Sequence, residues 1–544
     1  MAAPPQKLAR SLEALKSLQD RGVVAIRSSD LERIDRERLV KNGFLQPVMK
    51  GWYIPARPDT VAGESTAWYA SFWDFCASYL NERFNTDWCL SPEQSLLLHA
   101  GNRTVPPQLL VRSPKGDNKI TRLPHDTSLL TVRYNMPDQQ DIEVNNGLRL
   151  YALVPALVDC TPGLFHQNPT DIRATLSMIS DASEILAKLL EGGHTTIAGR
   201  LAGAFRNIGR DHTADDIVKT MRTADYDVRE SDPFETKPPV ILSGRERSPY
   251  VNRIHLMWHA MRVSVIERFP EAPGLPKNTK TYMQHVDDIY VTDAWHSLSI
   301  EGYRVSAELI ERVRNQSWNP DNNEEDREQR NALATRGYYL AYQVVRDSVA
   351  RVLKGENPGI VVDETHRTWY RELFAPSVTA GILQPADLAG YRTDQVYIRR
   401  SMHTPPGREA VRDLMPVLFD LIKEETNPAV RVVLGHFMFV YIHPYMDGNG
   451  RIGRFLMNVM LAAGGYPWTV IPVEERNTYM AALEAASVSN NIGPFTDFLA
   501  MLVRANLEGK PGPGVPRHFQ RPALNFLWCT PWRCLTPVIL SASF

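Results

Sequence analysis

The sequence lacks any long apolar run and has few cysteines. None of its 544 residues lies in a stretch apolar enough to span a bilayer, and the N-terminal MAAPPQKLAR shows no apolar core of a signal peptide. The five cysteines are odd in number, scattered and without a metal-binding spacing. Such usage is typical of reduced thiols in a cytosolic protein. We therefore expect a cytoplasmic protein without membrane contact.

The sequence also has almost no net charge and no visible internal repeat. Lys and Arg number 61 against 62 Asp and Glu, which gives a formal net charge of −1. Any contact with nucleic acid would therefore need a local basic patch. The length predicts more than one domain, and an apolar content of 43% is ample for sizeable cores.

The polar chemistry is concentrated between residues 443 and 454, HPYMDGNGRIGR. Pro444 disfavours helical geometry in the residue before it, so the apolar helix that precedes it should end with His443 facing a loop. The glycine-rich residues 448–450 can turn successive N–H groups inward. A second helix should begin near Arg451, with its positive end facing the same concavity. The stretch predicts an anion site.

Four side chains in this stretch could act on a phosphorylated substrate. Arg451 and Arg454 are three residues apart, on one helix face, where guanidinium groups can clamp phosphate oxygens. Asp447 is a hard oxygen ligand that could hold Mg²⁺ on a polyphosphate. His443 can take a hydroxyl proton at neutral pH. A simple turn between two helices would explain the glycines but not these four residues.

These residues resemble the Fic-domain signature H-P-F-x-D/E-G-N-G-R-x-x-R, with Tyr445 in place of the usual Phe. The resemblance implies an all-α fold with a β-hairpin flap. It implies transfer of AMP from ATP to a Tyr, Thr or Ser hydroxyl of a target protein, or of the protein itself, with Mg²⁺ as cofactor. His443 would be the catalytic base and Asp447 the metal ligand. The nucleotide phosphates would be bound by Gly448, Asn449, Gly450, Arg451 and Arg454.

Gly450 also bears on the type of transfer. The related kinase-like Doc subgroup carries Lys at this position, which reverses the orientation of the nucleotide. The glycine therefore favours nucleotidyl transfer over phosphate transfer.

A second stretch fits the inhibitory pattern S/T-x-x-x-E-G/N of this family, at Ser297, Glu301 and Gly302. Gly302 reads as a helix stop, which leaves Glu301 in the last turn of a helix predicted near 286–301. A negative charge is unfavourable there without a positive partner. The resemblance gives Arg454 as that partner and implies that the pair blocks the γ-phosphate. A helix-end Glu in solvent would fit the pattern alone, but the presence of the catalytic motif favours the inhibitory role. In some relatives this glutamate helps water to remove AMP, so Glu301 could serve a reverse reaction.

Residues 390–406 resemble the family's flap, a hairpin on which a target segment lies as an added strand. Val396, Tyr397 and Ile398 have the alternation and composition of a strand. An ordinary surface hairpin would look the same, but the position upstream of the signature favours the flap.

Residues 1–58 resemble the winged-helix domain of AbiEi-like antitoxin and regulator proteins. The expected elements are a helix over 8–18, a strand at 23–25, a helix capped by 28–30, a third helix over 35–42 and a wing over 45–54. With the third helix in a groove, DNA phosphates could be contacted by Arg33, Arg36, Arg38, Lys41 and Lys50. A winged helix used for protein contacts would leave the same charges solvated.

The remaining sequence divides by composition. We expect a mixed α/β region over 59–225, which resembles the one following the winged helix in the same antitoxin-like proteins. A polar Pro-rich linker over 226–249, a helical catalytic unit over 250–508 and a tail over 509–544 should follow. The oligomeric state stays open, a homodimer included.

Two functional hypotheses follow. The first is an autoinhibited protein adenylyltransferase with an N-terminal regulatory module. The second is a DNA-binding regulator of antitoxin type, whose Fic unit is silent or senses nucleotides. The intact His443 and both arginines favour the first, since a sensor can dispense with the base. A third reading keeps the enzyme but changes the nucleotide donor, because the signature fixes the phosphates and not the base.

Overall fold

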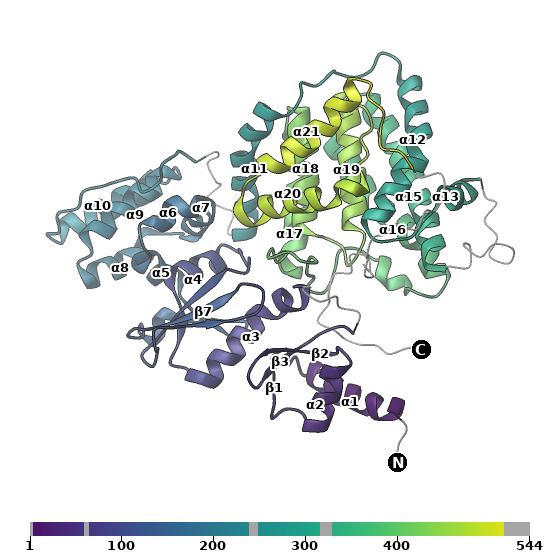
Figure 1. Cartoon of the computed structure of the whole chain (residues 1–544). Coiled ribbons are helices and arrows are strands. Elements are labelled where there is room, and N and C mark those ends of the chain that lie inside the picture. Colours follow the sequence, from purple (N-terminus) through teal and green to yellow (C-terminus); the bar gives the residue numbers. More distant parts are fainter. Residues whose placement is uncertain (1–3, 59–64, 239–247, 316–328, 516–544) are drawn as a thin grey trace. The chain divides into compact units, whose positions relative to one another are not determined.

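The computed structural model describes residues 4–58, 65–238, 248–315 and 329–515. Of the predicted tail, 509–544, residues 516–544 lie outside the described residues. The chain forms two compact units, whose elements Figure 1 labels. Among the described residues, the first unit comprises those up to Met257 together with Val396–Pro406, and the second comprises Trp258–Gln395 and residues 407–515.

The N-terminal part of the first unit is a small helical and β structure. Its elements are α1 (Pro4–Gln19), β1 (Ile26–Arg27), α2 (Arg33–Lys41), β2 (Leu45–Met49) and β3 (Trp52–Pro55). The antiparallel sheet has the order β1-β3-β2. The expected wing is the β2–β3 hairpin, whose turn includes Gly51 at φ 84°.

Two expectations for this part were wrong. The strand lies at β1 instead of 23–25, and one helix, α2, stands where two were predicted. The Asp30 carboxylate accepts a hydrogen bond from the Arg27 N–H (2.8 Å), so residues 28–30 close a turn and do not cap a helix. The winged-helix assignment stays a prediction.

The mixed α/β region follows as expected. Its elements are α3 (Thr66–Phe84), β4 (Cys89–Leu90), α4 (Pro92–His99), β5 (Gln108–Ser113), β6 (Lys119–Arg122), β7 (Ser128–Arg133), β8 (Ile142–Asn145) and β9 (Leu148–Tyr151). The four-stranded sheet has the order β4-β5-β7-β6, with β5 and β7 parallel. Aromatic residues of α3, among them Trp68, Phe72 and Phe75, are fully buried in the core beside it. The described cysteines, Cys76, Cys89 and Cys160, are buried free thiols.

Six short helices complete the first unit. They are α5 (Leu153–Asp159), α6 (Gly163–Gln167), α7 (Pro169–Met178), α8 (Ala182–Gly192), α9 (Thr195–Asn207) and α10 (Asp211–Thr223). The chain stays packed beyond residue 225, where the sequence predicted a linker. Val228 and Phe234 are buried in the core of these helices, because Gly199 and Gly203 let the backbone at 229–232 lie directly against α9. The rest of the predicted linker, 239–247, lies outside the described residues.

The second unit is helical, as predicted, and its described residues contain no strand. Its helices are α12 (Thr279–Ile300), α13 (Ala307–Arg314), α15 (Gln329–Leu353), α16 (Pro358–Thr379), α17 (Arg408–Glu424), α18 (Pro428–Ile442), α19 (Asn449–Gly464), α20 (Arg476–Ser489) and α21 (Gly493–Leu507), while α11 (Pro249–Arg268) begins in the first unit. In Figure 1, α18 and α19 lie side by side at its centre. No helix in the described ranges is both long and apolar enough to cross a bilayer.

The centre of this unit follows from the sequence of α18. The Asn427 side chain accepts hydrogen bonds from the N–H groups of Ala429 and Val430, and Pro428 occupies the first turn, so the start is fixed. Almost every later residue is apolar, and the helix is buried on all sides. Its end at Ile442 agrees with the prediction from Pro444.

The predicted β-hairpin flap is wrong as secondary structure. Residues 396–398 lie in no strand, and Val396 is fully buried. The backbone of this segment also makes hydrogen bonds to earlier residues of the first unit. The Met402 carbonyl accepts from the Val105 N–H (3.0 Å), and the Arg400 N–H donates to Thr66 Oγ1 (3.0 Å).

Candidate active site

The loop between α18 and α19 is tightly fixed. His443 follows the last residue of α18 with a left-handed backbone (φ 54°), and Gly448 (φ 82°) precedes the first residue of α19. Between them, the Asn449 side chain accepts a hydrogen bond from Tyr445 N–H (2.9 Å) and donates one to the Tyr445 carbonyl (2.8 Å). The N-terminal end of α19, with its positive dipole, is thereby held against the loop.

Two glycines of the signature stand where a side chain has no room. A Cβ at Gly448 would come within 2.9 Å of the Phe374 ring, and the positive φ also favours glycine. A Cβ at Gly450 would come within 2.4 Å of Glu301 Oε1. The absence of a side chain at Gly450 is therefore what lets Glu301 reach the first turn of α19.

His443 is buried and its tautomer is defined. Its Nδ1 lies 3.1 Å from the Val440 carbonyl, which can only accept, so Nδ1 carries the proton and Nε2 is the basic atom of the ring. Burial lowers the pKa of His443 to about 3, and the positive charge of Arg392 acts in the same direction. The imidazole is therefore neutral at pH 7, as a proton acceptor must be.

Arg451 is a buried cation held mainly by aromatic rings. Its guanidinium carbon lies 5.3 Å from the ring centre of Tyr303 and 5.1 Å from that of Phe374. Its Nη2 lies 3.6 Å from Asp447 Oδ2, and its buried Nε has no hydrogen-bond acceptor in the described part of the chain. A buried donor on a cation without an acceptor is costly, and a phosphate oxygen would satisfy it.

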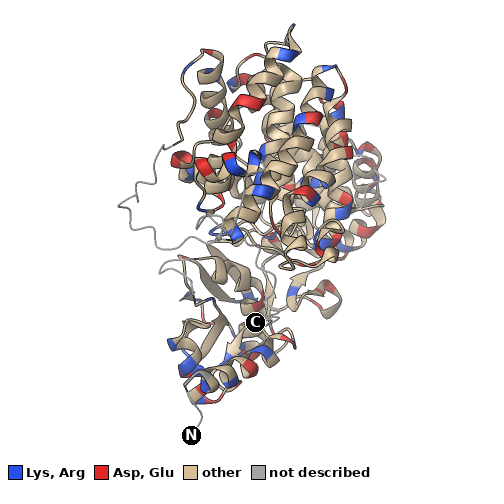
Figure 2. Ribbon diagram, turned by 90° about the vertical axis from the view of Figure 1, so that its right-hand side faces the viewer, with Lys and Arg blue, Asp and Glu red and all other residues tan. Residues whose placement is uncertain are grey.

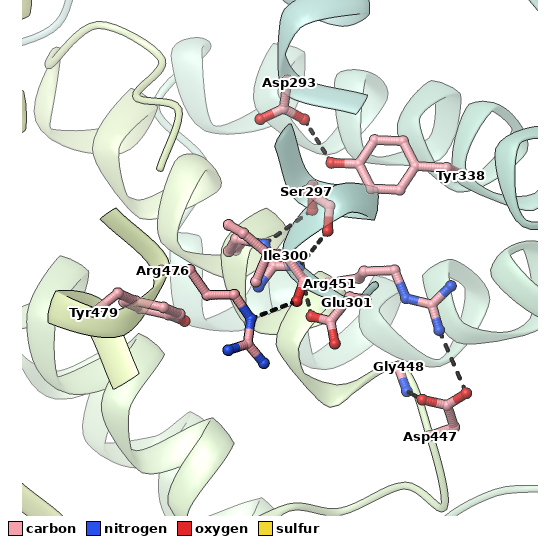
Figure 3. Close-up of polar contacts among 12 residues, drawn as sticks. Asp293, Ser297, Ile300, Glu301, Tyr338, Asp447, Gly448, Arg451, Arg476 and Tyr479 are labelled. Carbon is pink, nitrogen blue, oxygen red and sulfur yellow. Dashed lines mark hydrogen bonds and ion pairs between the residues drawn. The ribbon is translucent and has the colours of Figure 1, made fainter. Parts of the chain in front are cut away.

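Arg454 is bound to the end of α12, at Ser297 and Glu301, two residues that Figure 3 labels. Its Nη2 donates to Glu301 Oε1 (2.7 Å) and to the Ser297 carbonyl (3.1 Å), and its Nε donates to Ser297 Oγ (2.9 Å). Glu301 and Arg454 are 3% and 4% exposed, so this ion pair is little screened by solvent. Gly302 has φ 84° and ends α12 directly after Glu301. The structure thus brings together Ser297 and Glu301 of the S-x-x-x-E-G pattern and Arg454, the partner that the resemblance gives for Glu301.

Other contacts fix the last turns of α12. The Arg476 Nε donates to the Ile300 carbonyl (2.9 Å) at its end. One turn earlier than Ser297, the buried Asp293 accepts from Tyr338 OH (2.6 Å) and from Trp468 Nε1 (3.0 Å). The orientation of Glu301 is therefore set by side chains from several helices.

Asp447 is the candidate metal ligand of the loop. Its Oδ1 accepts from Gly448 N–H (2.6 Å), and its side chain is 29% exposed. The described residues contain no group of three or more His, Cys, Asp and Glu that could hold a metal ion. This donor set fits Mg²⁺ that arrives with a polyphosphate, since Mg²⁺ is commonly bound through one carboxylate, phosphate oxygens and water.

Several residues near the site were not found from the sequence. The rings of Tyr303 and Phe374, which are far apart in the sequence, both lie near the Arg451 guanidinium. Arg392 donates to the backbone carbonyl of His443. Tyr303 directly follows the inhibitory pattern, which was the one local signal for it. Phe374 carries no periodicity or motif of its own, and Arg392 lies in the flap-like segment 390–406 without a signal that points to His443, so only the fold reveals their contacts.

The predicted DNA-contacting residues are largely engaged within the first unit. Arg33 pairs with Glu37 (2.7 Å), and Arg38 donates to Ser11 Oγ (2.6 Å). Arg36 lies over the Tyr53 ring at 5.8 Å. Figure 2 shows acidic and basic residues interspersed on the helices near the N-terminus. DNA binding stays a prediction, and so do the roles of Lys41 and Lys50.

The region around the loop is similar to known proteins. Residues 362–461, which include α18, the loop and most of α19, match the Fic/DOC family. The chain is 35% identical over 132 residues to protein adenylyltransferase Fic of Drosophila willistoni, covering 24% of this chain and 26% of that protein. It is 32% identical over 132 residues to protein adenylyltransferase fic-1 of Caenorhabditis elegans, covering 24% and 25%. The chain therefore spans about a quarter of the length of these relatives.

Solved structures of related name also align. Fic-1 of C. elegans aligns with 18% identity and a TM-score of 0.35, over 60% of this chain and 91% of that one. A Fic domain containing signaling protein from Bacteroides thetaiotaomicron aligns with 17% identity and a TM-score of 0.33, over 48% and 98%. Residues 362–461 are thus similar to the Fic/DOC family, and the relatives that match in sequence are named protein adenylyltransferases.

Proposed function

We propose that this protein is an autoinhibited protein adenylyltransferase, which transfers AMP from ATP to a Tyr, Thr or Ser hydroxyl of a target protein, and of itself. The observation that carries the proposal is the buried Glu301–Arg454 pair at the phosphate-binding end of α19. It joins the two sequence patterns, 153 residues apart, into one site. The relatives' names support the AMP-transfer part.

The chemistry follows from the residues around the loop. The β- and γ-phosphates of ATP would lie at the N-terminal end of α19, where Arg451 and Arg454 supply donors. The Nε2 of His443 takes the proton of the acceptor hydroxyl as its oxygen attacks the α-phosphorus. The bond from the α-phosphorus to the bridging oxygen breaks, and pyrophosphate leaves. Mg²⁺ bound at Asp447 would neutralise charge on the phosphates.

The proposed inhibition is a competition for Arg454. Glu301 occupies the guanidinium edge that the γ-phosphate would use, and its carboxylate lies against Gly450. A carboxylate beside a phosphate also costs energy through like-charge repulsion in a buried site. ATP would therefore bind with its outer phosphates displaced, and transfer would be slow until Glu301 withdraws.

The reaction class is tested by the position of the label. Glu301→Gly protein is incubated with Mg²⁺, a cell lysate and ATP labelled at either the α- or the γ-phosphate. We expect protein labelling from the α-phosphate alone, with excess unlabelled ATP reducing it more than GTP, CTP or UTP does. Label from the γ-phosphate alone would establish a kinase, and preferential competition by another nucleotide would establish another donor.

The reverse reaction is examined with the same preparation. Labelled target is isolated and returned to wild-type protein, since Glu301 is the group that would assist water. Release of AMP by the wild type but not by Glu301→Gly would add removal of AMP to the activity. Label that persists with both proteins would restrict the function to transfer.

A further inference from the structure

Arg392 is a buried cation, 3% exposed, whose donors are directed at the end of α18. Its backbone N–H donates to the Pro444 carbonyl (2.9 Å), and its Nε donates to the His443 carbonyl (2.8 Å). Its Nη2 lies 3.5 Å from the Ile442 carbonyl, and its Nη1 donates to the Asp394 carbonyl (2.9 Å). One residue thus contacts the carbonyls of three successive residues centred on His443.

These carbonyls are a place where a cation is needed. The last carbonyls of a helix have no partner within the helix, and its C-terminal end carries a partial negative charge. His443 also adopts φ 54° and ψ 61°, a left-handed conformation that is unfavourable for a non-glycine residue. Such a conformation persists only where the surroundings impose it. Arg392 holds the loop on the His443 side, and Asn449 holds it at Tyr445.

We propose that Arg392 is the positioning residue of the catalytic base. It fixes the left-handed backbone at His443 and thereby sets where Nε2 meets the acceptor hydroxyl. The inference rests on the proposed function, because the placement of this ring affects a rate only if His443 is the base. Arg392 acts through His443 and needs no contact with nucleotide or acceptor.

The same residue links the base to the segment that resembles a target-docking flap. Its Nη1 holds the Asp394 carbonyl, two residues before Val396. Arg408 donates to the neighbouring Thr393 carbonyl (3.0 Å) from the start of α17, but it is exposed and pairs with the exposed Glu409 (3.3 Å). Arg408 therefore provides a matched control, an arginine that binds the same segment without positioning the base.

The test compares Arg392→Gln, Arg392→Lys and Arg408→Gln, each in the Glu301→Gly protein. The measurements are kcat and KM for AMP transfer, the Kd for ATP and the melting temperature. We expect Arg392→Gln to lower kcat by about 10²-fold, the cost of a catalytic group misplaced by roughly 1 Å, with KM and the Kd for ATP unchanged. Arg392→Lys should recover part of kcat, because an ammonium can bind one carbonyl but not the set that a fork reaches. Arg408→Gln should leave kcat unchanged.

Three results would overturn the inference. They are an unchanged kcat in a folded Arg392→Gln protein, an equal loss of kcat and of ATP affinity, and failure of both Arg392 variants to fold. The last two would make Arg392 a structural residue. Absence of AMP transfer in the Glu301→Gly parent would instead refute the proposed function itself, so the two failures are distinguishable.

Discussion

At the scale of single residues, the site contains buried charges, each of which would be unfavourable without its partner. Arg454 is buried and needs an anion, Glu301 is buried and needs a cation, and the two meet only because Gly450 has no side chain. Removing one partner of a buried ion pair commonly costs several kcal/mol, since the other charge is left uncompensated. In the proposed function, the γ-phosphate of ATP would replace the Glu301 carboxylate as the anion beside Arg454.

Gly450→Ala tests this arrangement by stability. The new Cβ would come within 2.4 Å of Glu301 Oε1, so we expect the wild-type background to lose about 1–3 kcal/mol of unfolding free energy, as for other overpacked sites. In the Glu301→Gly background the clashing atom is gone, and the same change should cost clearly less. Thermal or denaturant unfolding of the four proteins gives the comparison. Equal costs in both backgrounds would show that Glu301 does not fill this space.

At the scale of elements, helix ends were readable from the sequence and non-local contacts were not. Pro444 correctly predicted the end of α18, and Gly302 that of α12, because both act on the backbone next to them. The glycine-rich turn likewise placed the start of α19 within two residues of the prediction. These local signals were enough to locate the candidate site.

The wrong predictions concern pairing that local sequence does not decide. Residues 396–398 have a strand-like composition, but strand propensity is realised only where a partner is available. Here the segment bonds to Thr66 and Val105, more than 290 residues earlier in the chain. The contacts of Arg451 with the rings of Tyr303 and Phe374 are equally non-local. No window of sequence contains both partners in either case.

The attachment of Val396–Pro406 to the first unit gives a prediction at this scale. Met402 packs beside the aromatic core around α3, and its carbonyl accepts from Val105 N–H. Met402→Asp should expel this side chain from the apolar core and raise amide hydrogen exchange both at Val105 and across 396–406. Met402→Leu, which keeps apolar volume, is the control. Unchanged exchange in the Asp variant would mean that the segment is held by other contacts.

At the scale of the whole molecule, the second unit should be sensitive to acid. His296, His366, His436 and His443 are buried there, and burial lowers their pKa values to about 4, 4, 4 and 3. Between its folded pKa and about pH 6.5, each histidine is protonated in the unfolded chain but not in the folded protein. Their contribution to stability is therefore complete above that pH and falls as the pH drops toward the folded values, by at most about 1.4 kcal/mol per pH unit for each group.

Calorimetry of the full chain between pH 7 and pH 5 checks this expectation. The melting temperature of the second unit should fall as the pH falls. The raised pKa values of Asp293 and Asp363 act in the opposite direction, but they are two groups against four. Replacing His366 by Gln should reduce the slope. A flat or rising melting temperature would show that these histidines protonate in the folded protein.

The central claim is that Glu301 restrains an AMP transfer for which His443 is the base. The most direct measurement is incorporation of α-phosphate label by wild type, Glu301→Gly and Glu301→Gly/His443→Ala at equal ATP occupancy. The account predicts weak labelling by the wild type, labelling at least about tenfold stronger by Glu301→Gly, which corresponds to a barrier lower by about 1.4 kcal/mol, and a fall of about 10²-fold or more in the double variant, which still binds ATP. Equal labelling by wild type and Glu301→Gly, or full labelling by the double variant, would contradict it.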